Sequence, residues 1–199
     1  MRRAFDAAVS AAALVVAFPL MAMIAVAIRL TSRGPVLFTQ VRSGWGGREF
    51  TIYKFRTMRQ ARFGGEPDSS RVTPIGRALR STSLDELPQL WNVLRGDMSL
   101  IGPRPTLPEQ VARYSEHQRR RLEVRPGLTG WAQVNGRNSI SWPERIELDI
   151  HYVDNRSLRL DARIVALTVR QLFSPDGIIH DSGENPGFPV PTADPPGGA

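Results

Sequence analysis

Arg80 to Pro105 read RSTSLDELPQLWNVLRGDMSLIGPRP, and the expected fold is organised around this stretch. Its apolar side chains recur at i, i+3, i+4 and i+7, which is the spacing of one face of a short helix, at Leu87, Leu90, Trp91 and Leu94. Gly96 is expected to end this helix, because glycine readily adopts the left-handed conformation that follows many helices. Pro88 marks its beginning, since proline is tolerated only in the first helical turn.

The residues before Pro88 offer two starts for this helix. Ser83 and Glu86 have the spacing of a capping box, but that frame puts Pro88 at the fifth helical position, where it would remove a hydrogen bond. With Asp85 as the N-cap, Pro88 becomes the third helical residue, and we favour this frame. Asp85 and Glu86 are then expected at the positive end of a helix, beside backbone N–H groups.

Two arginines frame the adjacent carboxylates. Arg80 precedes them, and Arg104 follows between two prolines. Capping alone would explain a single Asp-Glu pair, but a helix N-terminus and arginines together attract phosphate. A carboxylate in such surroundings is expected to act as a metal ligand or a nucleophile. The pattern indicates phosphoryl chemistry, and it argues against a module that only binds anions, because carboxylates repel anions.

The composition is basic and free of cysteine. The 199 residues carry a net charge of +7, which indicates anionic partners such as nucleic acid, acidic lipid or phosphorylated substrates. The lack of cysteine excludes disulfides and thiolate chemistry. Of 26 basic residues, 25 are arginine, and Lys54 is the only lysine. This bias is either compositional drift or a sign that a compact ammonium group is needed at position 54.

An uncharged segment near the N-terminus is long enough to cross a bilayer. Ala7 to Ile28 contain 22 residues, about 33 Å of helix. Pro19 should kink it. A straight span and a secretory signal cleaved after residues 25–27 are the alternatives. A helix that enters, bends and leaves by the same face is favoured, because positive flanks mark the cytoplasmic side and arginines lie on both sides, at Arg2, Arg3, Arg29 and Arg33.

The residues between this segment and Arg80 predict a hairpin and a short helix. Strand-like runs at 36–38 and 50–53 surround a glycine-rich turn at 44–47. Lys54 and Arg56 alternate with aromatic residues, so both cations should point to one face, either toward an anion or to solvent. Thr73 followed by Pro74 is typical of a helix start, and that helix would carry Arg80 toward the central stretch.

The residues after Pro105 predict helices and one loop. A charged helix is expected over 108–123, with Arg119 to Arg121 forming a solvated face or contacting anionic lipid rather than nucleic acid. The loop at 125–138 carries Trp131, Gln133, Asn135 and Arg137, which suit a nucleobase, ribose or diphosphate. Two helices are expected over 140–172, and residues 181–199 form a flexible tail rich in proline and glycine.

Three motifs resemble the bacterial sugar transferase family. They are KFRTM at 54–58, VTPIGRALRSTSLDELPQLWNVLRGDMSLIGPRP at 72–105 and RPGLTGWAQVNGRN at 125–138. The resemblance is to its small, single-domain monotopic polyprenyl-phosphate phosphoglycosyl transferases. It implies an α+β, mostly helical fold with a re-entrant membrane helix over 1–30, a small β-hairpin and interfacial amphipathic helices. The catalytic domain, 31–180, would lie at the cytoplasmic face of the bacterial plasma membrane. Phe18 departs from the small polar residue that often precedes the proline.

The resemblance also implies an activity. Such enzymes transfer a sugar phosphate from a UDP-sugar to a polyprenyl phosphate such as undecaprenyl phosphate, and they release UMP. Asp85 would be the nucleophile and a ligand of Mg²⁺, with Glu86 assisting, and the positive surroundings would lower the basicity of Asp85. Substrate would be bound by Lys54, Arg56, Arg80, Arg104, Gln133, Arg137 and Asp149.

Several points stay open. The main alternative is a membrane-bound nucleotide-sugar hydrolase that uses the same aspartate with water as acceptor. The expected partners are UDP-sugar, polyprenyl phosphate and membrane lipid, and no nucleic acid. The identity of the sugar and the oligomeric state, for which a homodimer is one option, are not determined by the sequence.

Overall fold

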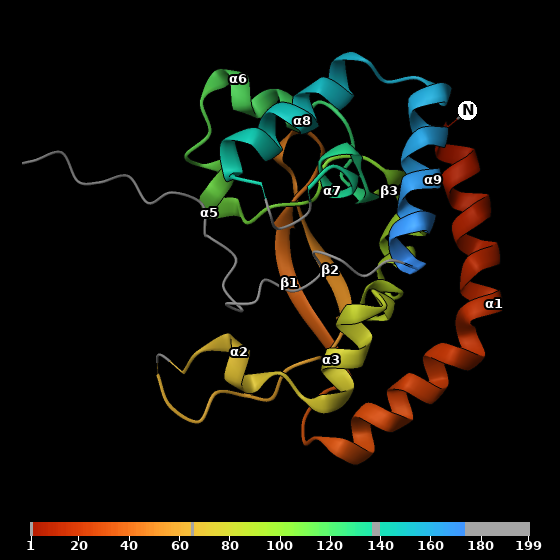
Figure 1. Cartoon of the computed structure of the whole chain (residues 1–199), viewed down its shortest axis with the longest axis vertical. Coiled ribbons are helices and arrows are strands. Elements are labelled where there is room, and N and C mark those ends of the chain that lie inside the picture. The colour runs from red at the N-terminus through yellow and green to blue at the C-terminus, as the bar shows by residue number, and fades with distance from the viewer. Residues whose placement is uncertain (1, 65, 137–139, 174–199) are drawn as a thin grey trace, which may run out of the picture.

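A computed structural model of the chain describes residues 2–64, 66–136 and 140–173 (Figure 1). It confirms a mostly helical α+β fold with a small two-stranded hairpin and an apolar N-terminal helix. The elements, in chain order, are α1 (Arg2–Thr31), β1 (Leu37–Ser43), η1 (Trp45–Gly47), β2 (Glu49–Phe55), α2 (Asp68–Arg71), α3 (Pro74–Ser81), η2 (Leu84–Glu86), α4 (Gln89–Arg95), β3 (Ser99–Ile101), α5 (Pro108–Val111), α6 (Glu116–Arg119), η3 (Arg120–Leu122), β4 (Gly127–Thr129), α7 (Trp131–Val134), α8 (Trp142–Asp154) and α9 (Leu158–Phe173).

Helix α1 is long and apolar enough to cross a membrane, by its length and composition. It contains Pro19 and bends along its length (Figure 1), as expected when a proline removes a backbone hydrogen bond. Near its N-terminus, Arg3 donates to the carbonyl of Val93 at 2.7 Å and to that of Leu94, at the end of α4. Near its C-terminus, Ile28 packs in the core with Phe55. Both ends of α1 therefore contact the same body of the protein.

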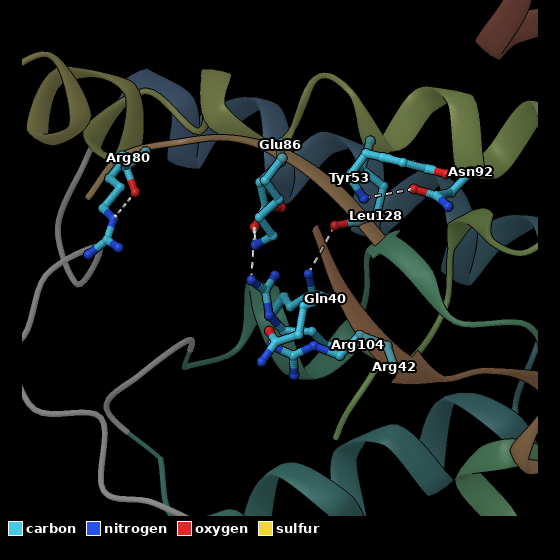
Figure 2. A network of polar contacts seen from close by, with 11 residues as sticks. Gln40, Arg42, Tyr53, Arg80, Glu86, Asn92, Arg104 and Leu128 are labelled. Atoms are coloured by element: carbon cyan, nitrogen blue, oxygen red, sulfur yellow. Dashed lines mark hydrogen bonds and ion pairs between the residues drawn. The ribbon is translucent and has the colours of Figure 1, made fainter. Parts of the chain in front are cut away.

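The hairpin forms as predicted. Strands β1 and β2 pair antiparallel with Leu37 opposite Phe55, and positive φ angles of 63° at Gly46 and 78° at Gly47 allow the tight turn. Helix α4 is attached to β2 through Asn92, whose side chain accepts from the backbone N–H of Tyr53 at 3.2 Å and donates to the Thr51 carbonyl at 2.7 Å (Figure 2). This attachment brings η2, which precedes α4, against the hairpin.

The start of the central helix differs from the prediction. Helix α3 begins at Pro74 as expected, with the Thr73 hydroxyl accepting from the backbone N–H of Gly76 at 2.9 Å. Asp85, however, does not cap α4. It lies inside the 3₁₀ turn η2, and α4 begins at Gln89, directly after Pro88. The reason is that Pro88 has no N–H to continue an α-helical ladder backward, so a tighter i to i+3 turn precedes it.

The region expected as one charged helix over 108–123 is broken into α5, α6 and η3. Ser115 accounts for the break, because it makes a capping box with Gln118 and so starts a new helix. The loop expected over 125–138 contains β4, which pairs in parallel with β3, Ser99 opposite Gly127. Local periodicity did not indicate this pairing, since it joins two three-residue strands far apart in the chain.

The two C-terminal helices were predicted correctly. Helix α8 begins with a capping box between Ser141 and Glu144, and its inner face packs on Val111 and Tyr114. Helix α9 lies beside the N-terminal half of α1 (Figure 1), and Arg2 pairs with Asp161 at 3.1 Å. On its outer side α9 exposes apolar side chains at helical spacing, at Leu158, Val165 and Val169.

Candidate active site

Asp85 and Glu86 are presented by a distinctive turn. Ser83, just before η2, has a φ of 57°, and it is the only non-glycine residue with positive φ among the described residues. This left-handed conformation is uncommon for residues other than glycine, and such residues often occur at functional sites. Leu84 and Leu87 pack on the core that contains Phe55 and Leu79. The two leucines thereby fix the turn, and Glu86 between them reaches Lys54 on β2.

Glu86 is held by two cations. The Lys54 ammonium donates to its Oε1 at 2.7 Å, and the Arg104 guanidinium donates to the same oxygen at 2.8 Å (Figure 2). Burial by itself would raise the pKa of Glu86, but the charges and hydrogen bonds of Arg104 and Lys54 outweigh it and lower this pKa. Glu86 therefore stays ionised, and the single lysine of the chain has a direct partner at the predicted site.

Asp85 has the opposite environment. Within the described residues its carboxylate makes no hydrogen bond or ion pair, although its side chain is largely buried. Burial, followed by the neighbouring charge of Glu86, raises its pKa, and Lys54, Arg104 and Arg80 only partly oppose this. The expected lowering of its basicity is thus wrong for the protein alone. Adjacent carboxyl groups with divergent environments are typical of sites where the two groups have different roles.

Arg104 contacts Glu86 directly, whereas the charge of Arg80 acts on Asp85 from the segment before the turn. Arg80 lies in the last turn of α3, and its Nε donates to the Thr57 hydroxyl at 2.9 Å. The backbone carbonyl of Arg104 accepts a hydrogen bond from Arg121 at 3.0 Å. Arg104 is therefore fixed at its backbone by Arg121 and at its side chain by Glu86. The raised pKa of Arg104 follows mainly from the charge of Glu86.

Asp149 is placed differently from the prediction. It pairs with Arg121, and the two side chains are only 2% and 1% exposed. Arg121 also donates to the Tyr114 hydroxyl at 2.6 Å. Asp149 therefore supports Arg104 through Arg121, and its own side chain is almost completely shielded from solvent. The expectation that Arg121 belongs to a solvated or lipid-facing triplet is wrong as well, because the folding of α8 over η3 buries it.

Known protein families support the resemblance seen in the sequence motifs at 54–58, 72–105 and 125–138. Residues 1–175 match the family described as bacterial sugar transferase. The chain belongs to this family.

Three relatives illustrate the range of bacterial sugar transferases. The uncharacterized sugar transferase EpsL of Bacillus subtilis (strain 168) is 54% identical over 76% of this chain and 76% of its own length. A UDP-glucose:undecaprenyl-phosphate glucose-1-phosphate transferase of Caulobacter vibrioides is 46% identical over 84% of this chain and 68% of its own length. An undecaprenyl-phosphate glucose phosphotransferase of Komagataeibacter xylinus is 44% identical over 87% of this chain, which spans 36% of that protein.

Two other predicted site residues of this bacterial sugar transferase, Arg56 and Gln133, have hydrogen-bond partners other than Glu86. Arg56 donates to the backbone carbonyls of Arg33 and Ser32, each at 2.9 Å, and so binds the chain just after α1. The expectation that Lys54 and Arg56 point to one face required the strand to continue; it ends at Phe55, and the two side chains go to different partners. Gln133 donates to the Leu128 carbonyl at 3.0 Å and shapes the loop before α7. Arg137 lies outside the described residues.

Sequence reasoning missed one cation of this site, Arg42. In the antiparallel register Phe38 faces Lys54 and Arg42 faces Phe50, so alternate residues of β1 and β2 share the face that meets Glu86. Figure 2 shows Arg42 near Arg104 on this face. The signal was available, because the predicted hairpin, once paired, places Arg42 on the same face as Lys54.

The donor atoms of this site are suited to Mg²⁺ bound together with a phosphate ligand. The described residues contain no cluster of three or more histidine, cysteine or acidic side chains that could hold a metal. Mg²⁺ does not need one, because it is commonly bound by one or two carboxylates with substrate phosphates and water. Asp85 offers an unpaired carboxylate, whereas an oxygen of Glu86 is occupied by Lys54 and Arg104. The residues fit an ion that arrives together with a diphosphate.

Proposed function

We propose that this chain transfers a sugar phosphate from a UDP-sugar to undecaprenyl phosphate, with release of UMP, in an early membrane step of polysaccharide synthesis. The observation that carries the proposal is the division of roles between two adjacent carboxylates. Glu86 is ionised and held by Lys54 and Arg104, while Asp85 is buried and unpaired among the same cations. The relatives named as undecaprenyl-phosphate sugar phosphotransferases support the substrate classes.

The first step is attack by a carboxylate oxygen of Asp85 on the sugar-linked phosphorus. A bond forms between this oxygen and phosphorus, and the bond to the bridging oxygen breaks, so UMP leaves with the electron pair. A phosphate oxygen of the lipid then attacks the same phosphorus and releases Asp85. Two steps avoid holding two anionic substrates side by side, and covalent catalysis divides one difficult transfer into two easier ones.

The cations around Asp85 supply most of the catalysis that phosphoryl transfer needs. This reaction depends chiefly on positioning and on neutralising phosphate charge. Lys54, Arg80 and Arg104 provide fixed positive charge beside Asp85. Mg²⁺, when bound, would neutralise further charge on the diphosphate, with Asp85 as its protein ligand. Glu86 orients Lys54 and Arg104 through its shared carboxylate oxygen.

The membrane arrangement that we propose is re-entrant, at the cytoplasmic face of the bacterial inner membrane. Support comes from the two ends of α1, which both contact the catalytic domain through Arg3 and Ile28. A straight span would separate these ends by the thickness of the bilayer. The middle of α1 is apolar and exposed, at Val15, Val16, Phe18 and Met23.

The deciding experiment measures intact mass. The purified full-length protein is incubated with UDP-glucose or another UDP-sugar and Mg²⁺, without lipid acceptor, and then quenched. A sugar-phosphate adduct is expected, together with UMP release close to one equivalent, and Asp85→Asn should show neither. Release of UMP only after undecaprenyl phosphate is added, with intersecting double-reciprocal plots, would instead mean direct transfer. Steady formation of free sugar phosphate without acceptor would identify a hydrolase.

A further inference from the structure

Arg42 is a further cation of this region that does not belong to the charges acting on Asp85. It lies on β1, on the face shared with Lys54, and its guanidinium donates to the Gln40 side-chain oxygen at 2.6 Å. Figure 2 shows Arg42 and Arg104 on the same side of Glu86. The two arginines come from segments far apart in sequence, the hairpin and the Pro-Arg-Pro loop, and only the folded chain brings them together.

The charge of Arg42 is incompletely compensated. Burial, followed by the neighbouring charge of Arg104, lowers the pKa of Arg42 to about 10, and Glu109 and Glu86 only partly oppose this. Glu86 is already shared by Lys54 and Arg104. The Nε of Arg42 is also buried without a hydrogen-bond partner among the described residues. A buried donor on a charged group is costly unless an anion meets it.

A third arginine makes the same region more positive. Arg145 on α8 has its pKa lowered by burial and then by the charge of Arg104. Asp149 partly offsets the charge of Arg145, but its ion pair is with Arg121. Like charges that are gathered this closely and desolvated destabilise the protein by itself. An anion with several acceptor oxygens, such as phosphate, would relieve this repulsion, since two guanidinium groups match its geometry.

The charges that act on Asp85 and on Arg42 indicate which of the two phosphates of a UDP-sugar would bind at Arg42. The charges acting on Asp85 are those of Glu86, Lys54, Arg104 and Arg80, whereas Arg42 is acted on by Arg104, Glu109 and Glu86. Arg104 and Glu86 are common to both groups, whereas Arg42 is not among the charges that act on Asp85, so we place Arg42 farther from the nucleophile than Arg104. In a diphosphate, the phosphate next to the attacked one is joined to it by a single bridging oxygen. A group bound between Arg104 and Arg42 would occupy that neighbouring position.

We propose that Arg42 and Arg104 together bind the phosphate of the UDP-sugar that departs with UMP. This inference rests on the proposed function and names a residue for its leaving group. When the Asp85 oxygen bonds to the sugar-linked phosphorus, the electron pair of the broken bond stays on the bridging oxygen. The departing phosphate therefore passes from one negative charge to two, and no proton is required. Fixed guanidinium groups bind the doubly charged form better, so they favour the transition state.

The test compares ligands with and without the phosphate. Binding of UMP and of uridine to the full-length protein in detergent is measured by calorimetry for wild type, Arg42→Gln and Arg42→Lys. Arg42→Gln should weaken UMP binding roughly 10- to 100-fold, as expected for a lost charge-assisted contact, while uridine binding stays at its wild-type value. Arg42→Lys keeps the charge and should lose less. The matched control is Arg48→Gln, which removes an exposed arginine from the same hairpin where it lies over Trp45, and it should bind UMP like wild type.

The outcomes separate the inference from the proposed function. Equal weakening of UMP and uridine, or no change in UMP binding, would overturn the role of Arg42. If Arg42→Gln forms the phosphosugar adduct at the wild-type rate but fails to pass it to undecaprenyl phosphate, the arginine serves the lipid phosphate and the assignment is wrong. If Arg42→Gln does not fold, the comparison of Arg42→Lys with wild type decides. Absence of turnover in wild type with every UDP-sugar would contradict the proposed function itself.

Discussion

The buried pair of Arg121 and Asp149 allows the most quantitative prediction. Asp149→Asn keeps the size of the side chain but removes its charge, and it leaves the Arg121 guanidinium, whose side chain is 1% exposed, without a counter-ion. Removing one partner of a buried ion pair typically costs about 3–5 kcal/mol. Arg121 keeps the Tyr114 hydroxyl and the Arg104 carbonyl as acceptors, so we expect the lower end, about 3 kcal/mol.

The assay is thermal unfolding followed by circular dichroism in one detergent. For a chain of 199 residues, a loss of about 3 kcal/mol corresponds to a fall in Tm of roughly 6–12 °C. The matched control is Asp154→Asn. Asp154 lies on α8, as Asp149 does, and pairs with Arg120, but both of these side chains are about 40% exposed. An exposed pair contributes about 0–1 kcal/mol, so this variant should unfold close to wild type.

The Asp149→Asn variant also distinguishes a supporting role of Asp149, through Arg121, from a direct role in substrate binding. If Asp149 acts through Arg121 on the Arg104 backbone, Asp149→Asn should lower kcat and stability together. A direct substrate contact would instead raise KM and leave Tm unchanged. Activity is assayed at a temperature below the unfolding transitions of both variants. An Asp149→Asn protein whose Tm lies within 2 °C of that of the Asp154→Asn control would refute the stabilising role of the Arg121–Asp149 pair. Replacing both members, with Arg121→Met and Asp149→Leu, should recover much of the stability but not the activity, because removal of Arg121 deprives the Arg104 carbonyl of its donor.

The remaining predictions concern the nucleophile, its neighbour, the metal and the membrane helix. Asp85→Asn should fold normally and release no UMP, and wild-type release by this variant would contradict its role as nucleophile. Glu86→Gln should lower turnover severely, because Lys54 and Arg104 lose their shared carboxylate. A turnover rate near that of wild type would mean that Glu86 is not needed to hold these two cations. Mg²⁺ should bind much more tightly in the presence of UDP than alone, measured by calorimetry, since the cations near Asp85 repel a lone metal ion. A reporter fused before Arg2 should be cytoplasmic, and a periplasmic signal would mean that α1 spans the membrane.

The sequence by itself determined the local elements and much of the site. The apolar periodicity and Gly96 located α4, and Thr73 with Pro74 located the start of α3. The glycine-rich turn predicted the hairpin, and the spacing of Arg80, Asp85, Glu86 and Arg104 indicated phosphoryl chemistry. These features could be read because they depend on neighbours within one turn of helix or one hairpin.

Only the tertiary structure decided which charges meet. Arg121 and Asp149 form a buried pair across 28 residues of sequence, Arg56 turns to the chain after α1, and Arg42 joins Arg104 in place of Arg56. The contrast between ionised Glu86 and unpaired Asp85 was also invisible in the sequence, because both precede Pro88 in one turn. A side chain's partner and pKa depend on burial and on charges brought from distant segments, and short-range periodicity carries no record of either.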